Sequence, residues 1–183
     1  MRPTPPTTAR VTIQQADFDL GAEVSALRAA DLAVGAVASF IGTVRDRNSG
    51  KAGEVSAMEL VHYPGMTEAA IEAMIDEALR RFDIRAARVV HRVGPLQPGD
   101  QIVLVAVSSP HRGQAFQACE FLMEYLKTQA PFWKKETTPE GARWVDARVA
   151  DDAALARWGI AAGNAAANAA ANAAGDAAGD AAR

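Results

Sequence analysis

The chain of 183 residues is long enough for one domain with a hydrophobic core and short for two. Hydrophobic residues make up 49% of it and charged residues 22%, which fits a soluble globular protein. The net charge of -3 excludes a global basic field that would attract nucleic acid or an anionic membrane, so any site for an anion must be a local cluster of cations.

The single cysteine, Cys119, cannot form an internal disulfide, and the chain has no CxxC pair. This cysteine usage fits a reducing compartment, and we expect a cytoplasmic protein. No stretch approaches the roughly 18 apolar residues of a membrane span. The N-terminal residues lack the apolar segment of a secretory signal.

The two ends differ in composition from the middle. Residues 1–9 contain three prolines and three threonines and are expected to form a flexible lead. Residues 159–183 are a low-complexity Ala/Gly/Asn/Asp sequence with almost nothing large to bury, so we expect a disordered tail without a catalytic role. The compact domain is then residues 10–158.

The first half of this domain shows alternating helix and strand patterns. Leu20, Val24, Leu27 and Ala30 predict a short amphipathic helix with Asp19 as its N-cap. Residues 35–44 and 55–62 read as buried strands, the second one ended by a Tyr-Pro-Gly turn. A second helix should begin near Thr67 and end at two arginines, 80 and 81, with a buried face of Ile71, Met74, Ile75, Ala78 and Leu79.

The second half predicts a hairpin followed by a long helix. Residues 87–94 and 101–108 read as strands that flank a Pro- and Gly-containing loop. The helix should start at Ser109, with Pro110 at its first position, and end at Pro131. A last strand is expected over 143–148. Since strands and helices do not follow a strict βαβ rhythm, the sequence predicts the α+β class.

Several kinds of catalytic site are absent from the sequence. It has no Gly-rich phosphate loop, no GxSxG and no HExxH, and its three histidines lack metal-ligand spacing, so no metal is expected. Cys119 falls on the apolar face of the long helix, where a core thiol is the favoured interpretation over a nucleophile.

Cations stand at several suggestive positions, each with a simpler structural alternative. His111 and Arg112 fall in the first turn of the long helix, where free backbone N–H groups favour the binding of an anion. The alternative is that the two residues form a solvated surface pair. Lys127 lies at the end of that helix, where a lysine also simply complements the dipole. Arg45 follows the strand 35–44 and is equally consistent with a solvated loop arginine.

Lys134 and Lys135 follow two aromatic residues, Phe132 and Trp133. Apolar walls lower a lysine pKa and suit it to acid–base chemistry, although an exposed lysine pair is the alternative, favoured for Lys135. His111 and Lys127 are sixteen positions apart, about 24 Å on one continuous helix. One small ligand cannot reach both, so a site that uses both requires a second subunit, and a homodimer is the economical hypothesis.

Six sequence blocks together resemble the catalytic (large) subunit family of molybdopterin synthase. They are GTVR (42–45), HYPGMTEAAI (62–71), HRVGPLQPGD (91–100), SSPHRGQAF (108–116), YLKTQAPFWKKE (125–136) and PEGARWVDAR (139–148). They follow the family's order and spacing over nearly all of residues 35–148.

The resemblance implies an α+β fold of the α/β-hammerhead type, with a mixed or antiparallel sheet and flanking helices. It implies a sulfurtransferase that converts precursor Z, a cyclic pyranopterin monophosphate, into molybdopterin for the molybdenum cofactor. Two sulfurs would come from the thiocarboxylated C-terminal Gly-Gly of a small ubiquitin-like subunit. The implied assembly is a large-subunit homodimer with a small subunit at each end, and no cofactor is required.

The family's site residues carry over onto matching positions. Lys127 and Lys134 match the catalytic lysines. The substrate-binding positions match Thr43, Val44, Arg45, His111, Arg112, Lys127, Lys134, Lys135 and Glu136, with Arg148 at the pocket rim. The family often has lysine where Thr43 stands, so this chain lacks one cation there. Two other functions compete with this one: a non-catalytic scaffold that docks a ubiquitin-like sulfur carrier, and a generic phosphate-ester hydrolase.

Overall fold

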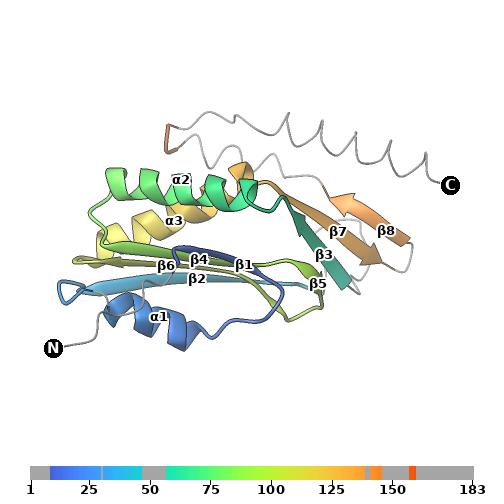
Figure 1. Cartoon of the computed structure of the whole chain (residues 1–183), viewed down its shortest axis with the longest axis horizontal. Helices are drawn as coiled ribbons and strands as arrows, with labels where there is room; N and C mark the ends of the chain where they lie inside the picture. The colour runs from blue at the N-terminus through green and yellow to red at the C-terminus, as the bar shows by residue number, and fades with distance from the viewer. Residues whose placement is uncertain (1–8, 30, 47–56, 139–140, 146–156, 160–183) are drawn as a thin grey trace.

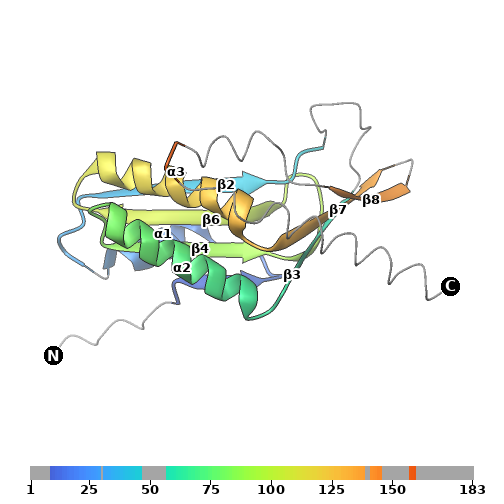
Figure 2. The same cartoon turned by 90° about the horizontal axis from the view of Figure 1, so that it is seen from above.

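The computed structural model describes residues 9–29, 31–46, 57–138, 141–145 and 157–159. Almost all of the expected N-terminal lead and C-terminal tail therefore lies outside the described residues. In the described part, two four-stranded sheets and three helices form the fold (Figures 1 and 2). The α+β class expected from the sequence is confirmed.

The first sheet is mixed and carries helices on both faces. Its strands, in spatial order, are β1 (Val11–Gln14), β4 (Ala86–Arg92), β6 (Gln101–Ser109) and β2 (Ala36–Thr43). β1 is parallel to β4, and the other pairs are antiparallel. α1 (Leu20–Ala29) covers one face, while α2 (Met66–Arg81) and α3 (Arg112–Gln129) lie side by side over the other (Figures 1 and 2).

Strand alternation divides the core between these faces. Val90 and Leu104 point toward α1 and pack with Phe18 and Leu27. The neighbouring side chains of the same strands join the larger cluster under α2 and α3, which includes Ile71, Met74, Ile75, Phe121 and Leu122, all at most 1% exposed. Because helices cover both sides of the two central strands, β4 and β6 read as nearly continuous apolar runs.

The second sheet extends beyond one end of the first (Figure 1). It is antiparallel, with the order β5 (Gly94–Leu96), β3 (Ala57–His62), β7 (Phe132–Thr138) and β8 (Gly141–Val145). A small core of Val44, Met58, Leu60 and Leu96 joins it to the end of β2. The site described below lies at this junction.

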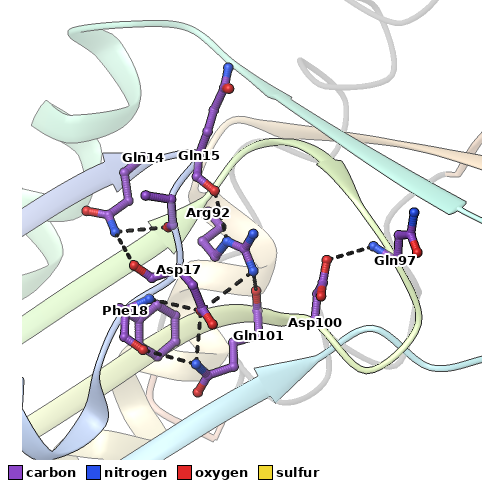
Figure 3. A network of polar contacts seen from close by, with 9 residues as sticks. Gln14, Gln15, Asp17, Phe18, Arg92, Gln97, Asp100 and Gln101 are labelled. Carbon is purple, nitrogen blue, oxygen red and sulfur yellow. Dashed lines mark hydrogen bonds and ion pairs between the residues drawn. The ribbon is translucent and has the colours of Figure 1, made fainter.

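A polar network fixes the loops beside the junction (Figure 3). The Arg92 guanidinium donates to the carbonyl oxygens of Gln15 and Gln101, both at 3.0 Å, and lies 3.6 Å from the Asp17 carboxylate. The same carboxylate accepts a hydrogen bond from the Gln101 amide at 2.9 Å. These contacts tie the segment after β1 to the ends of β4 and β6.

The strongly periodic segments were predicted well, except that Leu79, expected on the buried face of α2, is 37% exposed. Asp19 accepts the Ala22 N–H at 2.8 Å, as expected of an N-cap. The turn before α2 contains Gly65 at φ +82°, a conformation that suits glycine. The predicted hairpin is present as β4 and β6, although its connection also contributes β5 to the second sheet.

Other boundaries differ from the prediction. α3 begins at Arg112 rather than at Ser109, because β6 continues to Ser109, which pairs with Ala36. The buried Ser109 hydroxyl donates to Asp83 O at 2.7 Å and accepts the His111 N–H at 3.1 Å, so Pro110 precedes the helix. β1 and β7 were not predicted. β8 starts at Gly141, and residues 146–148 lie outside the described part.

None of the helices that the structure describes is long and apolar enough to cross a membrane.

Beside the C-terminal end of α2, Trp158 packs edge-on against Phe82 and Phe121, with ring centroids 5.7 and 5.6 Å apart.

Candidate active site

A cavity of about 690 Å³ lies where the end of α3 meets β2 and the second sheet. This volume is typical of pockets that hold small molecules. Its lining residues are Phe40, Ile41, Gly42, Thr43, Val44, Arg45, Met58, Leu60, His91, Ile102, Val103, Met123, Leu126, Lys127, Ala130, Phe132 and Lys134. Most of the lining residues are therefore apolar, and three of them have cationic side chains.

The first cation comes from the end of β2. The pairing of β2 with β6 shifts register between Gly42 and Thr43, and the strand ends at Thr43, which still pairs with Gln101. Val44 is then held on both sides: its N–H donates to Asp100 O, and its carbonyl accepts the Gly99 N–H, both at 2.9 Å. This fixed backbone presents Thr43, Val44 and Arg45 to the cavity, which places all three expected substrate-binding residues in its wall.

The other two cations stand on either side of one turn. Lys127 lies in the last turn of α3, and Lys134 is the third residue of β7. Both line the cavity, so the two lysines expected to be catalytic lie in the same site. Phe132 also lines it, because residues two apart on a strand share a face.

Lys135 is placed differently. It follows Lys134 on β7 and pairs with Glu59, and it does not line the cavity. A strand turns successive side chains to opposite faces. The backbone of Glu136 pairs with Met58 and Arg143, and its side chain is outside the described part. Arg148 also lies outside the described residues. The roles of these three residues stay predictions.

His111 and Arg112 lie at the far end of α3. His111 is the N-cap and Arg112 the first helical residue, and both are exposed. The 18 residues of α3 span about 27 Å. Accordingly, neither residue lines the cavity of its own chain. The structure confirms the separation that the sequence predicted.

The loop before His111 is tightly fixed. The Gly35 N–H donates to Ser109 O at 3.0 Å. A Cβ atom at Gly35 would lie only 2.3 Å from Pro110 O, so a side chain cannot be accommodated there without movement of the backbone. This close contact and the Ser109 hydroxyl together fix the backbone immediately before the exposed His–Arg pair.

His91 contributes a neutral polar group to the cavity wall. Its Nδ1 lies 2.8 Å from Arg92 O and donates to that carbonyl, and its ring stacks on Phe132 at 3.8 Å and 15°. Burial, with a smaller contribution from the nearby His62, lowers the pKa of His91 to about 4, although the hydrogen bond to the Arg92 carbonyl acts in the opposite direction. The imidazole is therefore uncharged at neutral pH.

Cys119 has no role as a nucleophile here. It is buried under the sheet, with its sulfur 3.8 Å from Val105 O, and burial raises its pKa to about 11. A thiol with such a pKa is almost entirely protonated at neutral pH. The interpretation as a core cysteine is confirmed. Among the described residues, no three His, Cys, Asp or Glu side chains cluster in a way that could hold a metal ion.

The apolar lining was not predicted as part of a site. Phe40 is 39% exposed although it is large and apolar. Met123 and Leu126 line the cavity and also belong to the core under α3. Phe132 was expected only as an apolar neighbour of the two lysines that follow it.

Comparison with known proteins identifies the family. The profile of the MoaE protein family matches residues 13–129. The chain belongs to the MoaE family. The molybdopterin synthase catalytic subunit of Ralstonia nicotianae is 65% identical over 154 residues, which cover 84% of this chain and 86% of that protein.

Solved structures of MoaE proteins share the fold. The MoaE protein from Burkholderia ambifaria is 61% identical, with a TM-score of 0.72 over 84% of this chain and 99% of that one. A molybdopterin synthase chain from Staphylococcus aureus is 32% identical, with a TM-score of 0.68 over 75% and 98%. The resemblance of this chain to the catalytic subunits of molybdopterin synthase, which rested on six sequence blocks, is confirmed.

Proposed function

We propose that this chain converts precursor Z into molybdopterin, using sulfur from the thiocarboxylated Gly-Gly terminus of a small ubiquitin-like subunit. The observation that carries the proposal is that Lys127 and Lys134, on different elements, line one cavity together with Arg45. Membership of the family of sulfurtransferases of molybdenum cofactor biosynthesis supports it. We expect the reaction to take place in the cytoplasm, in keeping with the single reduced cysteine.

The chemistry of the cavity suits this substrate. Precursor Z carries a cyclic phosphate, and arginine and lysine form strong charge-assisted hydrogen bonds with phosphate oxygens. The pterin rings and the small-subunit tail need apolar surface, which Phe40, Met58 and Phe132 supply.

His111 and Arg112 would join the site from a second copy of the chain. The length of α3 keeps them out of the cavity that Lys127 lines. A symmetric dimer that sets the α3 N-terminus of each copy beside the cavity of the other would complete both sites. The N-terminal N–H groups of the helix would then also face the anionic substrate.

In the mechanism that we propose, the thiocarboxylate sulfur attacks a side-chain carbon of the bound precursor. Lys127 and Lys134 stabilise the negative charge that develops and move protons. The bond between that carbon and a phosphate oxygen breaks as the first sulfur is added, so the cyclic phosphate opens. Water then hydrolyses the thioester to the small subunit, which leaves with a free carboxylate terminus while the sulfur stays on the precursor. The hemisulfurated intermediate stays bound while a second thiocarboxylated small subunit replaces the spent one.

Two alternatives are less consistent with the site. A scaffold that only docks the neutral Gly-Gly tail needs neither lysine, yet both line the cavity. A phosphate-ester hydrolase has less support, because the described residues contain no cluster of three metal-ligating side chains and their cysteine is a buried thiol.

Reconstitution tests the proposal. The purified chain is mixed with thiocarboxylated small subunit and precursor Z, and molybdopterin is followed through its fluorescent oxidised derivative. Product that depends on this chain supports the synthase. Tight binding of the small subunit without product would favour the scaffold, and the absence of both would refute the assignment of substrate and partner.

A further inference from the structure

One short turn sets the relative placement of the two cavity lysines. α3 ends at Gln129, two residues after Lys127, and β7 begins at Phe132, two residues before Lys134. Ala130 between them is extended, with φ -76° and ψ 129°, and its carbonyl accepts the Phe132 N–H at 2.9 Å. Any change in this turn would therefore move Lys134 relative to Lys127.

A threonine from a distant part of the chain binds the turn between α3 and β7 from outside the cavity. Thr67, in the first turn of α2, is 0% exposed. Its hydroxyl donates to Pro131 O at 3.1 Å and accepts the Tyr63 N–H at 3.2 Å. The start of α2 is itself fixed, because the Glu68 carboxylate accepts the Gly65 N–H at 2.7 Å. Thr67 does not line the cavity, so it can act on a ligand there only through Pro131.

The side chain after Pro131 is held from the first sheet. The His91 ring stacks on Phe132 with centroids 3.8 Å apart. Its hydrogen bond to Arg92 O fixes the orientation of the ring on β4. The turn is thus held at two successive residues, by α2 at Pro131 and by β4 at Phe132.

We propose that Thr67 and His91 are positioning residues that clamp Pro131 and Phe132 and thereby fix Lys134 against Lys127 for catalysis. This inference rests on the proposed function, because it assigns to the clamp the placement of the two lysines of that reaction. A side chain that stabilises the transition state loses much of its effect after a displacement that is small compared with its distance from the reacting atoms.

Substitutions at Thr67 separate the effect of its hydroxyl group from the effect of the volume of its side chain. Thr67→Val keeps the volume and removes both hydrogen bonds, while Thr67→Ser keeps the hydroxyl. In the reconstituted complex we expect Thr67→Val to lower kcat about tenfold or more with KM changed less than about twofold, since a misplaced group costs mainly turnover. Thr67→Ser should stay close to the unsubstituted protein.

Substitutions at His91 test the second contact independently. His91→Phe keeps an aromatic ring for the stack with Phe132, and His91→Ala removes it. We expect His91→Ala to lower kcat as Thr67→Val does, and His91→Phe, which keeps the stack, to lower it less. Because His91 also lines the cavity, the Lys134 resonance described below is needed to separate loss of the stack from loss of a polar contact to the ligand. If Thr67→Val does not fold, the His91 pair and that resonance together decide the question.

A readout without turnover keeps the clamp separate from the proposed function. Reductive methylation with ¹³C-formaldehyde labels the lysines, and Lys134→Arg assigns the Lys134 resonance. Thr67→Val and His91→Ala should shift that resonance, while Thr67→Ser and His91→Phe should not. If the unsubstituted complex makes no molybdopterin, the proposed function fails, and this resonance still tests the clamp. Folded Thr67→Val and His91→Ala with normal kcat and an unmoved Lys134 resonance would overturn it.

Discussion

Lys127→Ala and Arg112→Ala remove cations from opposite ends of α3, and dimers with one copy of each variant should regain activity that neither variant has alone. This result follows if each site takes Lys127 from one chain and Arg112 from the other. In a mixed dimer, one site then has both native residues, and the other site lacks both.

The geometry fixes the size of the effect. Lys127 lies 15 positions after Arg112 on α3, about 22 Å along the helix axis, so the two cations cannot serve one cavity from one chain. Random mixing makes about half of the dimers mixed, each with one of two sites intact, so the mixture should show about a quarter of the original activity. Mixed dimers isolated through two different affinity tags should show about half.

The assay is reconstituted synthesis of molybdopterin with thiocarboxylated small subunit and precursor Z. A matched control mixes Lys127→Ala with Lys134→Ala. These two lysines line the same cavity of one chain, so every site in that mixed dimer lacks one of them and no activity should return. Isolated mixed dimers of Lys127→Ala and Arg112→Ala that are no more active than their parents would refute the composite site.

Three further predictions concern single groups. Lys127→Ala and Lys134→Ala should each lower kcat about 100- to 1000-fold, by analogy with loss of one oxyanion donor, and near-normal turnover in both would remove their catalytic roles. Arg88, 7% exposed, forms a two-point pair with Glu23, so Arg88→Ala should lower the free energy of unfolding by about 3 kcal/mol in urea titrations, and Arg88→Met with Glu23→Gln should cost less. The folded pKa of His91, about 4 against 6.5 unfolded, means that its contribution to stability is present above pH 6.5 and lost as pH falls toward 4. Unfolding titrations at several pH values should show this loss, up to about 3 kcal/mol, and His91→Phe should lack it.

The parts of the fold that could be predicted are those where one physical pattern dominates. α2 and α3 have apolar faces at helical spacing, and β4 and β6 are apolar runs because helices cover both sides of their sheet. β7 was missed because FWKKE reads as an aromatic pair beside a charged pair. Its alternation shows only once Phe132 and Lys134 are seen on one side, facing the cavity.

The site was predictable to a similar degree. Arg45 and Lys127 stood out as cations at element ends and Lys134 as a cation beside two aromatic residues, and the resemblance to the family selected them over their structural alternatives. The apolar wall was not, since Met58 or Leu126 in a cavity wall looks the same in sequence as a core residue. Thr67 was also out of reach, because its contact with Pro131 joins residues 64 positions apart.

The cysteine chemistry explains why such a site needs a partner. A dithiolene requires two sulfurs, and the single cysteine of this chain is buried, with a pKa raised to about 11. The chain therefore has no thiolate to supply, and sulfur must arrive from outside. A cavity of about 690 Å³ with an apolar wall can admit an extended Gly-Gly tail, since glycines add no side-chain bulk. In the reaction that we propose, cations at the same wall would meet the phosphate of one substrate and the thiocarboxylate of the other, so a single cluster of like charge would bring together two anions that repel each other in water.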